Sequence, residues 1–211
     1  MFTPDGFWRD DGAMRRRTEP RWNHNIHFHS VVLAAIPTGA QSALDVGTGD
    51  GMLAVDLRQT LSDVVAIDVD ATVLSKAAAQ YPGISWVEGD VMTYDFGRTF
   101  DVVASVATVH HLPDLRDGLQ RLADLTGPGG TLVIVGLARP STARDYILSA
   151  VGSVQDQWLT RRRNVWEHSA PAVWPPPHTY QEVRHIATDV LPGVRWQQFP
   201  LWRYALTWRR P

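Results

Sequence analysis

A glycine-rich octamer, LDVGTGDG at residues 44–51, is the feature that most constrains the fold of this chain. It continues an apolar run, Ala43–Val46, that predicts a buried strand, and it leads into Met52–Arg58, whose apolar residues recur at helical spacing. Glycine reaches backbone angles closed to other residues and leaves the main chain bare to a ligand. The octamer therefore predicts a strand, a ligand-binding turn and a helix, as in nucleotide-binding sheets.

Downstream of the octamer, the chain alternates between predicted strands and helices as far as residue 137. Such alternation predicts a parallel sheet that has helices on both faces and binds its ligands at the carboxyl ends of the strands. The expected strands are 63–68, 84–90, 100–105 and 131–137, the expected helices are 71–80 and 114–125, and a turn is expected at Gly127–Gly130.

An acidic residue ends the second predicted strand and narrows the choice of ligand. Asp68 lies 21 residues after Gly47, where a nucleoside-binding sheet places a carboxylate that accepts hydrogen bonds from a ribose diol. A dinucleotide fingerprint would need a small residue at position 52, but Met52 stands there and the third glycine comes one residue early. The pattern thus favours a nucleoside ligand other than NAD.

Five segments together resemble successive motifs of the class I S-adenosylmethionine-dependent methyltransferases, in the order of that family. The resemblance implies an α/β fold: a single Rossmann-like, doubly wound, seven-stranded sheet, mostly parallel, with a C-terminal antiparallel hairpin and a cap insertion. The segments Val194–Leu201 and Trp202–Arg209 are the expected hairpin. The five matching segments are Leu44–Gly51, Ala66–Asp70, Glu88–Val91, Phe100–Leu112 and Gly127–Val135.

The resemblance also implies S-adenosyl-L-methionine as the cofactor and a set of residues that contact it. Asp68 is expected at the ribose and Asp90 at the exocyclic amine of adenine, with the Val91 backbone amide beside it. An N-terminal helix is expected to close over the donor. The expected contacts are Asp45, Gly47, Thr48, Gly49, Asp68, Val69, Asp90, Val91 and Ser105, together with Trp22, His24 and His29 of the N-terminal segment.

Two histidines, His110 and His111, are the candidate catalytic residues. They follow the fourth strand, whose carboxyl end faces the expected donor, and histidine is the natural base at neutral pH. Methyl transfer from a sulfonium requires alignment but no metal. The N-terminal histidines at positions 24, 27 and 29 do not share one helical face, so we expect no metal site.

The domain plan is a single methyltransferase domain over residues 1–211. It comprises an N-terminal arm and helix at 1–36, a donor-binding core at 37–138, a substrate cap at 139–178, and a C-terminal helix and hairpin at 179–211. Residues 1 to about 20 are expected to be a loose arm. The cap is expected to contain a short helix at 146–151, to be otherwise irregular, and to act as a lid whose tryptophans at 158, 166 and 174 become buried on ligand binding.

Composition bears on the class of substrate and on the expected cellular location of the protein. A net charge of −2 disfavours bulk-charge binding to nucleic acid, and the absence of cysteine excludes a thiol nucleophile. The chain has no predicted leader or membrane span, so we expect a cytoplasmic monomer or homodimer. The leading hypothesis is transfer to an O, N or C nucleophile of a small aromatic molecule, in the manner of secondary-metabolite tailoring. The alternatives are an RNA methyltransferase, with Arg161–Arg163 as the phosphate contact, and a non-catalytic S-adenosylmethionine-binding protein.

Overall fold

The computed structural model describes residues 22–163, 165, 166 and 175–211 of the 211-residue chain. The expected N-terminal arm, and Trp174 of the expected cap, lie outside the described residues. No helix in the described part is long and apolar enough to cross a membrane.

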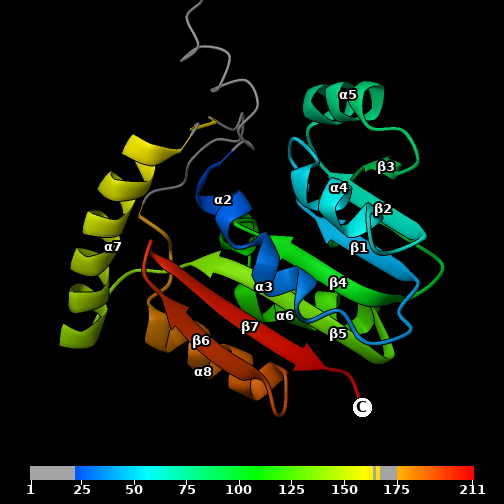
Figure 1. The fold of residues 1–211 in the computed structure, drawn as a ribbon. Helices are drawn as coiled ribbons and strands as arrows, with labels where there is room; N and C mark the ends of the chain where they lie inside the picture. Colours follow the sequence, from blue (N-terminus) through cyan, green and yellow to red (C-terminus); the bar gives the residue numbers. More distant parts are fainter. Residues whose placement is uncertain (1–21, 164, 167–174) are drawn as a thin grey trace, which may run out of the picture.

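A seven-stranded sheet forms the centre of the molecule (Figure 1). Its strand order is β3-β2-β1-β4-β5-β7-β6; the first five pair in parallel, and β7 is antiparallel to both β5 and β6. The predicted sheet and its terminal hairpin are therefore confirmed. The strands are β1 Ser42–Val46, β2 Asp63–Asp68, β3 Ser85–Glu88, β4 Phe100–Val106, β5 Thr126–Leu137, β6 Arg195–Phe199 and β7 Arg203–Arg209.

Helices cover both faces of this sheet (Figure 1). Strand residues alternate between two apolar clusters: Leu44 and Val46 contribute to the one that contains α6 and α8, and Ala43 to the one that contains α3 and α4. A sheet buried on both sides explains why its strands read as continuous apolar runs. The helices are α2 His24–His27, α3 His29–Leu33, α4 Met52–Arg58, α5 Ala71–Gln80, the 3₁₀ turn η1 Val109–His111, α6 Leu115–Leu125, α7 Ala143–Arg162 and α8 Tyr180–Val190.

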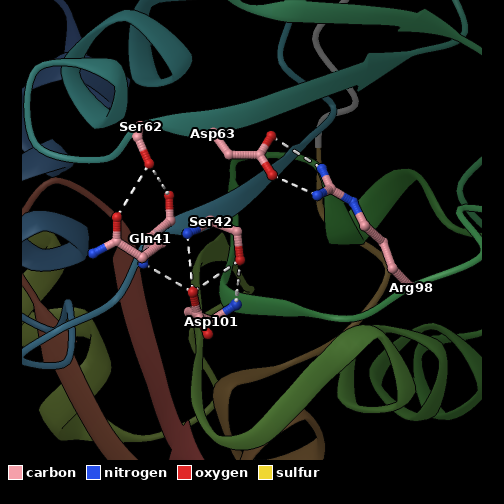
Figure 2. A network of polar contacts seen from close by, with 6 residues as sticks. All are labelled: Gln41, Ser42, Ser62, Asp63, Arg98 and Asp101. Carbon is pink, nitrogen blue, oxygen red and sulfur yellow. Dashed lines mark hydrogen bonds and ion pairs between the residues drawn. The ribbon is translucent and has the colours of Figure 1, made fainter.

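A polar network joins the amino ends of the parallel strands (Figure 2). The Asp101 carboxylate accepts hydrogen bonds from the backbone amides of Gln41 and Ser42 and from the Ser42 hydroxyl, at 2.8–2.9 Å. Nearby, Arg98 forms an ion pair with Asp63. These contacts hold β1, β2 and β4 together at the amino edge, so they fix the strands without occupying the carboxyl edge, where a ligand is expected.

Two segments differ from the sequence-based expectation. The helix expected at 146–151 is the 20-residue helix α7, which begins at a capping box formed by Thr142 and Asp145. The turn expected at Gly127–Gly130 belongs to β5. Its backbone pairs with Arg210, because Gly129 donates to the Arg210 carbonyl and the Arg210 amide donates to Gly130. The helix is therefore longer than expected, and the glycine segment, where Gly129 has φ of 68°, interrupts the pairing of β4 with β5 between Thr126 and Thr131. Neither difference changes the fold.

Candidate functional site

A cavity of about 570 Å³ opens at the carboxyl ends of the central strands. The strand order reverses between β1 and β4, and such a switch point is where open α/β sheets bind ligands. The loops after β1, β2, β3 and β4 form one wall, and the N-terminal helices form the other. The lining includes Asn23, Asn25, His29, Asp45, Gly47, Thr48, Gly49, Asp68, Val69, Asp90, Val91, Thr108, His111 and Trp166.

The glycine turn presents bare main chain to this cavity. Gly47 and Gly49 have φ of 68° and 51°, in the left-handed region that glycine tolerates. A Cβ added at Gly49 would meet nothing within 4 Å, whereas one at Gly47 would lie 2.2 Å from Cγ2 of Thr108. Gly49 therefore leaves space that a ligand can use, and Gly47 is needed for packing against the loop after β4.

Asp45 holds the turn from beneath. Its carboxylate is 2 % exposed and accepts a hydrogen bond from the Thr48 hydroxyl at 2.6 Å. Burial raises the pKa of Asp45 to about 6, against the lowering effects of that hydrogen bond and of nearby His29. Asp45 and Thr48 therefore set the shape of the turn at the base of the cavity.

Two further carboxylates, Asp68 and Asp90, line the cavity from neighbouring loops. Asp68 accepts hydrogen bonds from the backbone amides of Gly49, at 2.8 Å, and Asp70, at 3.0 Å. The backbone amide of Met92 donates to Asp90 at 2.9 Å. Each carboxylate has further lone pairs for a ligand. Between them, Val69 is 72 % exposed, an apolar surface beside the two acids.

The N-terminal helices contribute polar groups to the opposite wall. His29 is buried, lines the cavity and pairs through Nδ1 with Asp56 at 2.7 Å. Trp22 and His24 are not among the lining residues: Trp22 is buried beside Val165, and His24 bonds to Asp156 of α7 at 2.9 Å. The structure therefore brings His29 to the expected site and gives Trp22 and His24 partners outside it.

The two histidines after β4 have different surroundings. His111 is exposed and lines the cavity, whereas His110 lies behind it, with its ring 4.2 Å from the His111 ring. Burial, with help from the charges of His111 and Arg203, lowers the pKa of His110 to about 4. Its Nδ1 is buried without a hydrogen-bond partner in the described part of the chain. His110 is therefore neutral at pH 7.

Other expected and unexpected residues complete the site. Ser105 is fully buried, bonds to the Val46 carbonyl and does not line the cavity. Sequence reasoning gave no role to Asn25 or Thr108, both of which line it. The signal for Thr108 was its place just before the histidine pair. Among the described residues, no group of three or more acids and histidines is arranged to hold a metal ion.

Comparisons with known proteins agree with this geometry. Residues 44–134 match the family model described as a methyltransferase domain. The chain is 40 % identical over 193 residues to an uncharacterized methyltransferase of Mycobacterium tuberculosis, which covers 90 % of this chain and 98 % of the relative. It is 27 % identical to a ubiquinone biosynthesis O-methyltransferase of Azorhizobium caulinodans, over 67 % of this chain and 57 % of the relative.

A solved structure supports the fold at lower identity. It is the structure of CalS10 with bound S-adenosylmethionine, an amino pentose methyltransferase from Micromonospora echinaspora. The likeness covers 100 % of both chains, with a TM-score of 0.63 and 18 % identity.

Proposed function

The chain belongs to the class I S-adenosylmethionine-dependent methyltransferases, and we propose that it methylates an O, N or C nucleophile of a small aromatic molecule. The observation that carries this proposal is the cavity at the β1/β4 switch point, because the bare glycine turn, Asp68, Asp90 and His111 line the same space. Its volume lies in the usual range for small-molecule sites.

The residues fit the donor that the family uses. S-adenosylmethionine supplies an activated methyl group on a sulfonium. The open space beside Gly49 admits a ligand against the main chain. We assign Asp68 to the ribose hydroxyls, Asp90 and the Val91 amide to adenine, and the exposed Val69 side chain to the adenine face. Asp45 and Thr48 hold the turn that these groups share.

We assign the role of general base to His111. It lines the cavity, whereas His110 does not, and burial lowers the pKa of His110 to about 4, which makes it a weak base. A positioned base contributes about 10²–10⁴ in rate when the nucleophile carries a proton. The remaining acceleration comes from alignment, which can supply about 7–11 kcal/mol. Residues His29, Asn25 and Trp166 of the facing wall would exclude water and orient the acceptor.

An aromatic acceptor is supported by the apolar part of the cavity wall and by the names of relatives. Met52, Leu112 and Trp166 lie along the lining. Relatives are named for ubiquinone biosynthesis and for demethylmenaquinone, and a structural neighbour is named for an amino pentose. The two quinone names are the ones that support an aromatic acceptor.

The test is transfer of tritiated methyl from S-adenosylmethionine to a panel of phenols, aromatic amines and indoles. We expect at least one turnover product, and we expect His111→Ala to slow its formation about a hundredfold with donor affinity unchanged. A loss of less than tenfold would assign the base to another residue. A panel without any product would contradict the aromatic class.

The alternative acceptor is RNA, and its support is the basic end of α7. Arg161 and Arg162 occupy the last turn of that helix and are exposed. A salt-sensitive gel shift with tRNA, abolished in the double variant Arg161→Gln/Arg162→Gln, would favour RNA. We expect no shift, because the formal net charge of the chain is −2.

A further inference from the structure

A buried arginine without a counter-charge lies behind the cavity wall. Arg203 begins β7 and is 7 % exposed. Its Nη2 donates to Asn25 Oδ1 at 2.9 Å and its Nη1 to the Leu201 carbonyl at 3.4 Å, while Nε has no partner. No aspartate or glutamate of the described residues forms an ion pair with it. Buried charges are normally paired, so this one indicates a missing anion.

A second unpaired group accompanies it. His110 Nδ1 and Arg203 Nε are the buried side-chain polar atoms without a partner in the described part of the chain. They lie within electrostatic reach of each other, because the charge of Arg203 helps to lower the pKa of His110. The charge of Arg203 also acts to lower the pKa of Tyr180 of α8, so this residue lies nearby as well. Two orphaned groups from distant parts of the sequence therefore occupy one interior region.

This region adjoins the cavity directly. Asn25, which lines the cavity, accepts a hydrogen bond from Arg203, and His111, which also lines it, has its ring 4.2 Å from the ring of His110. Arg203 and His110 are thus each separated from the cavity by one lining residue, Asn25 and His111 respectively. Of the two described groups that accept hydrogen bonds from Arg203, the Asn25 side chain and the Leu201 carbonyl, only Asn25 belongs to a residue that lines the cavity.

The backbone on both sides of this region is strained. In the described part of the chain, the non-glycine residues with positive φ are Ala107, Leu201 and Trp202, at 57°, 61° and 58°. Ala107 stands three residues before His110, and the other two immediately precede Arg203. Such strain collects at ligand sites, where the surrounding structure holds it in place.

We propose that Arg203, with His110, binds a carboxylate of the methyl acceptor. This inference rests on the proposed function and names the chemistry of its substrate. The guanidinium edge that carries Nε and Nη2 matches two carboxylate oxygens, and Asn25 Oδ1 now occupies half of that edge as a neutral substitute. A neutral His110 donates one further hydrogen bond without adding charge. The acceptor's anion would offset the charge of Arg203.

The test compares acids with their amides. The probes are 3- and 4-hydroxybenzoate and indole-3-acetate against the matching carboxamides, titrated by calorimetry into protein saturated with S-adenosylhomocysteine. For the wild type we expect at least one acid to bind tenfold or more tightly than its amide. In Arg203→Gln that preference should fall below twofold, while S-adenosylhomocysteine affinity stays within threefold. The control Arg195→Gln, at an exposed position of β6, should keep the preference.

A second variant covers the case in which Arg203→Gln does not fold. Asn25→Asp builds the missing counter-charge into the protein, so we expect it to raise the thermal unfolding temperature and to abolish the acid preference. An acid preference that survives in Asn25→Asp, or a wild type that binds no acid better than its amide, would overturn the carboxylate site. Absence of S-adenosylhomocysteine binding in the wild type would instead contradict the proposed function, so the two failures are distinguishable.

Discussion

Single glycines in the turn after β1 serve different purposes, and substitution separates them. Gly49→Ala places a methyl group into open cavity, so we expect it to abolish donor binding and to destabilise the fold by only about 1–2 kcal/mol through its left-handed backbone. Gly47→Ala collides with Thr108, so its main effect should be a larger loss of stability. Calorimetry with S-adenosylhomocysteine and thermal unfolding distinguish the two.

A matched variant tests the cause assigned to Gly47. Adding Thr108→Ala removes the Cγ2 and Oγ1 atoms nearest the new methyl group, at 2.2 and 2.3 Å, and should restore part of the stability lost in Gly47→Ala. Equal unfolding temperatures for the single and double variants would show that the collision is not the cause.

His110 should make stability depend on pH. Its pKa is about 4 in the folded protein and 6.5 as a free side chain, so below pH 6.5 the unfolded chain binds the proton more readily. We therefore expect wild type to lose about 1–2 kcal/mol more than His110→Asn between pH 7 and pH 5, after allowance for solvent screening. Urea denaturation at several pH values measures the difference.

Asp45 acts in the opposite direction over the same range. Its pKa is raised to about 6 in the folded protein, so its protonation on acidification stabilises the fold. Because wild type and His110→Asn both contain Asp45, this effect cancels when their stabilities are compared. Parallel stability curves for wild type and His110→Asn would show that His110 is not held neutral by burial.

Among the elements, α7 carries the clearest consequence for function. It bonds to the N-terminal wall through Asp156 and His24, and Gly152 brings its backbone against the turn before β7, where a Cβ would lie 2.6 Å from the Leu201 amide. Figure 1 shows this helix, in yellow, beside the ends of β6 and β7. Its placement therefore affects both walls of the acceptor region.

Two similar capping boxes allow a controlled test of that role. Thr142 caps α7 and Thr179 caps α8, each with an acidic residue three positions on. Thr142→Ala and Thr179→Ala should each cost about 0.5–2 kcal/mol of stability. Thr142→Ala should weaken acceptor binding more than Thr179→Ala does, because α7 bonds to the N-terminal wall through His24, whereas α8 reaches the acceptor region only through Tyr180 beside Arg203. Equal effects of the two variants on acceptor affinity would contradict the role given to α7.

The sequence predicted β2 and α5 with their observed bounds, since each has a clear apolar pattern. It missed most of α7 because polar or small residues of this helix face inward and apolar ones face outward. Asp145 and Gly152 are buried, whereas Ile147, Val154 and Trp158 are 65 %, 70 % and 52 % exposed. A pattern that assumes an apolar inner face cannot find such a helix. Whether the cap moves on binding remains a prediction.

At the scale of the whole molecule, the topology assembles the site. The sequence could place the glycine turn, Asp68, Asp90 and His111 near one another, because parallel strands bring their carboxyl ends to one edge of the sheet. The Arg203–Asn25 contact could not, since its partners are 178 positions apart and no local pattern relates them. Likewise, the burial that distinguishes His110 from His111 arises from tertiary packing, and the two adjacent histidines give no sign of it in the sequence.

The most direct test of the donor site is calorimetry of S-adenosylhomocysteine with Asp68→Ala and, as the control, Asp114→Ala. Asp114 caps α6 and does not line the cavity, so its variant should lose stability and keep donor affinity. Asp68→Ala should weaken binding by at least about 1.5–3 kcal/mol, because it loses charge-assisted hydrogen bonds to the ribose and its hold on the Gly49 amide. Unchanged affinity in Asp68→Ala, or an equal loss in both variants, would contradict the assignment of this cavity.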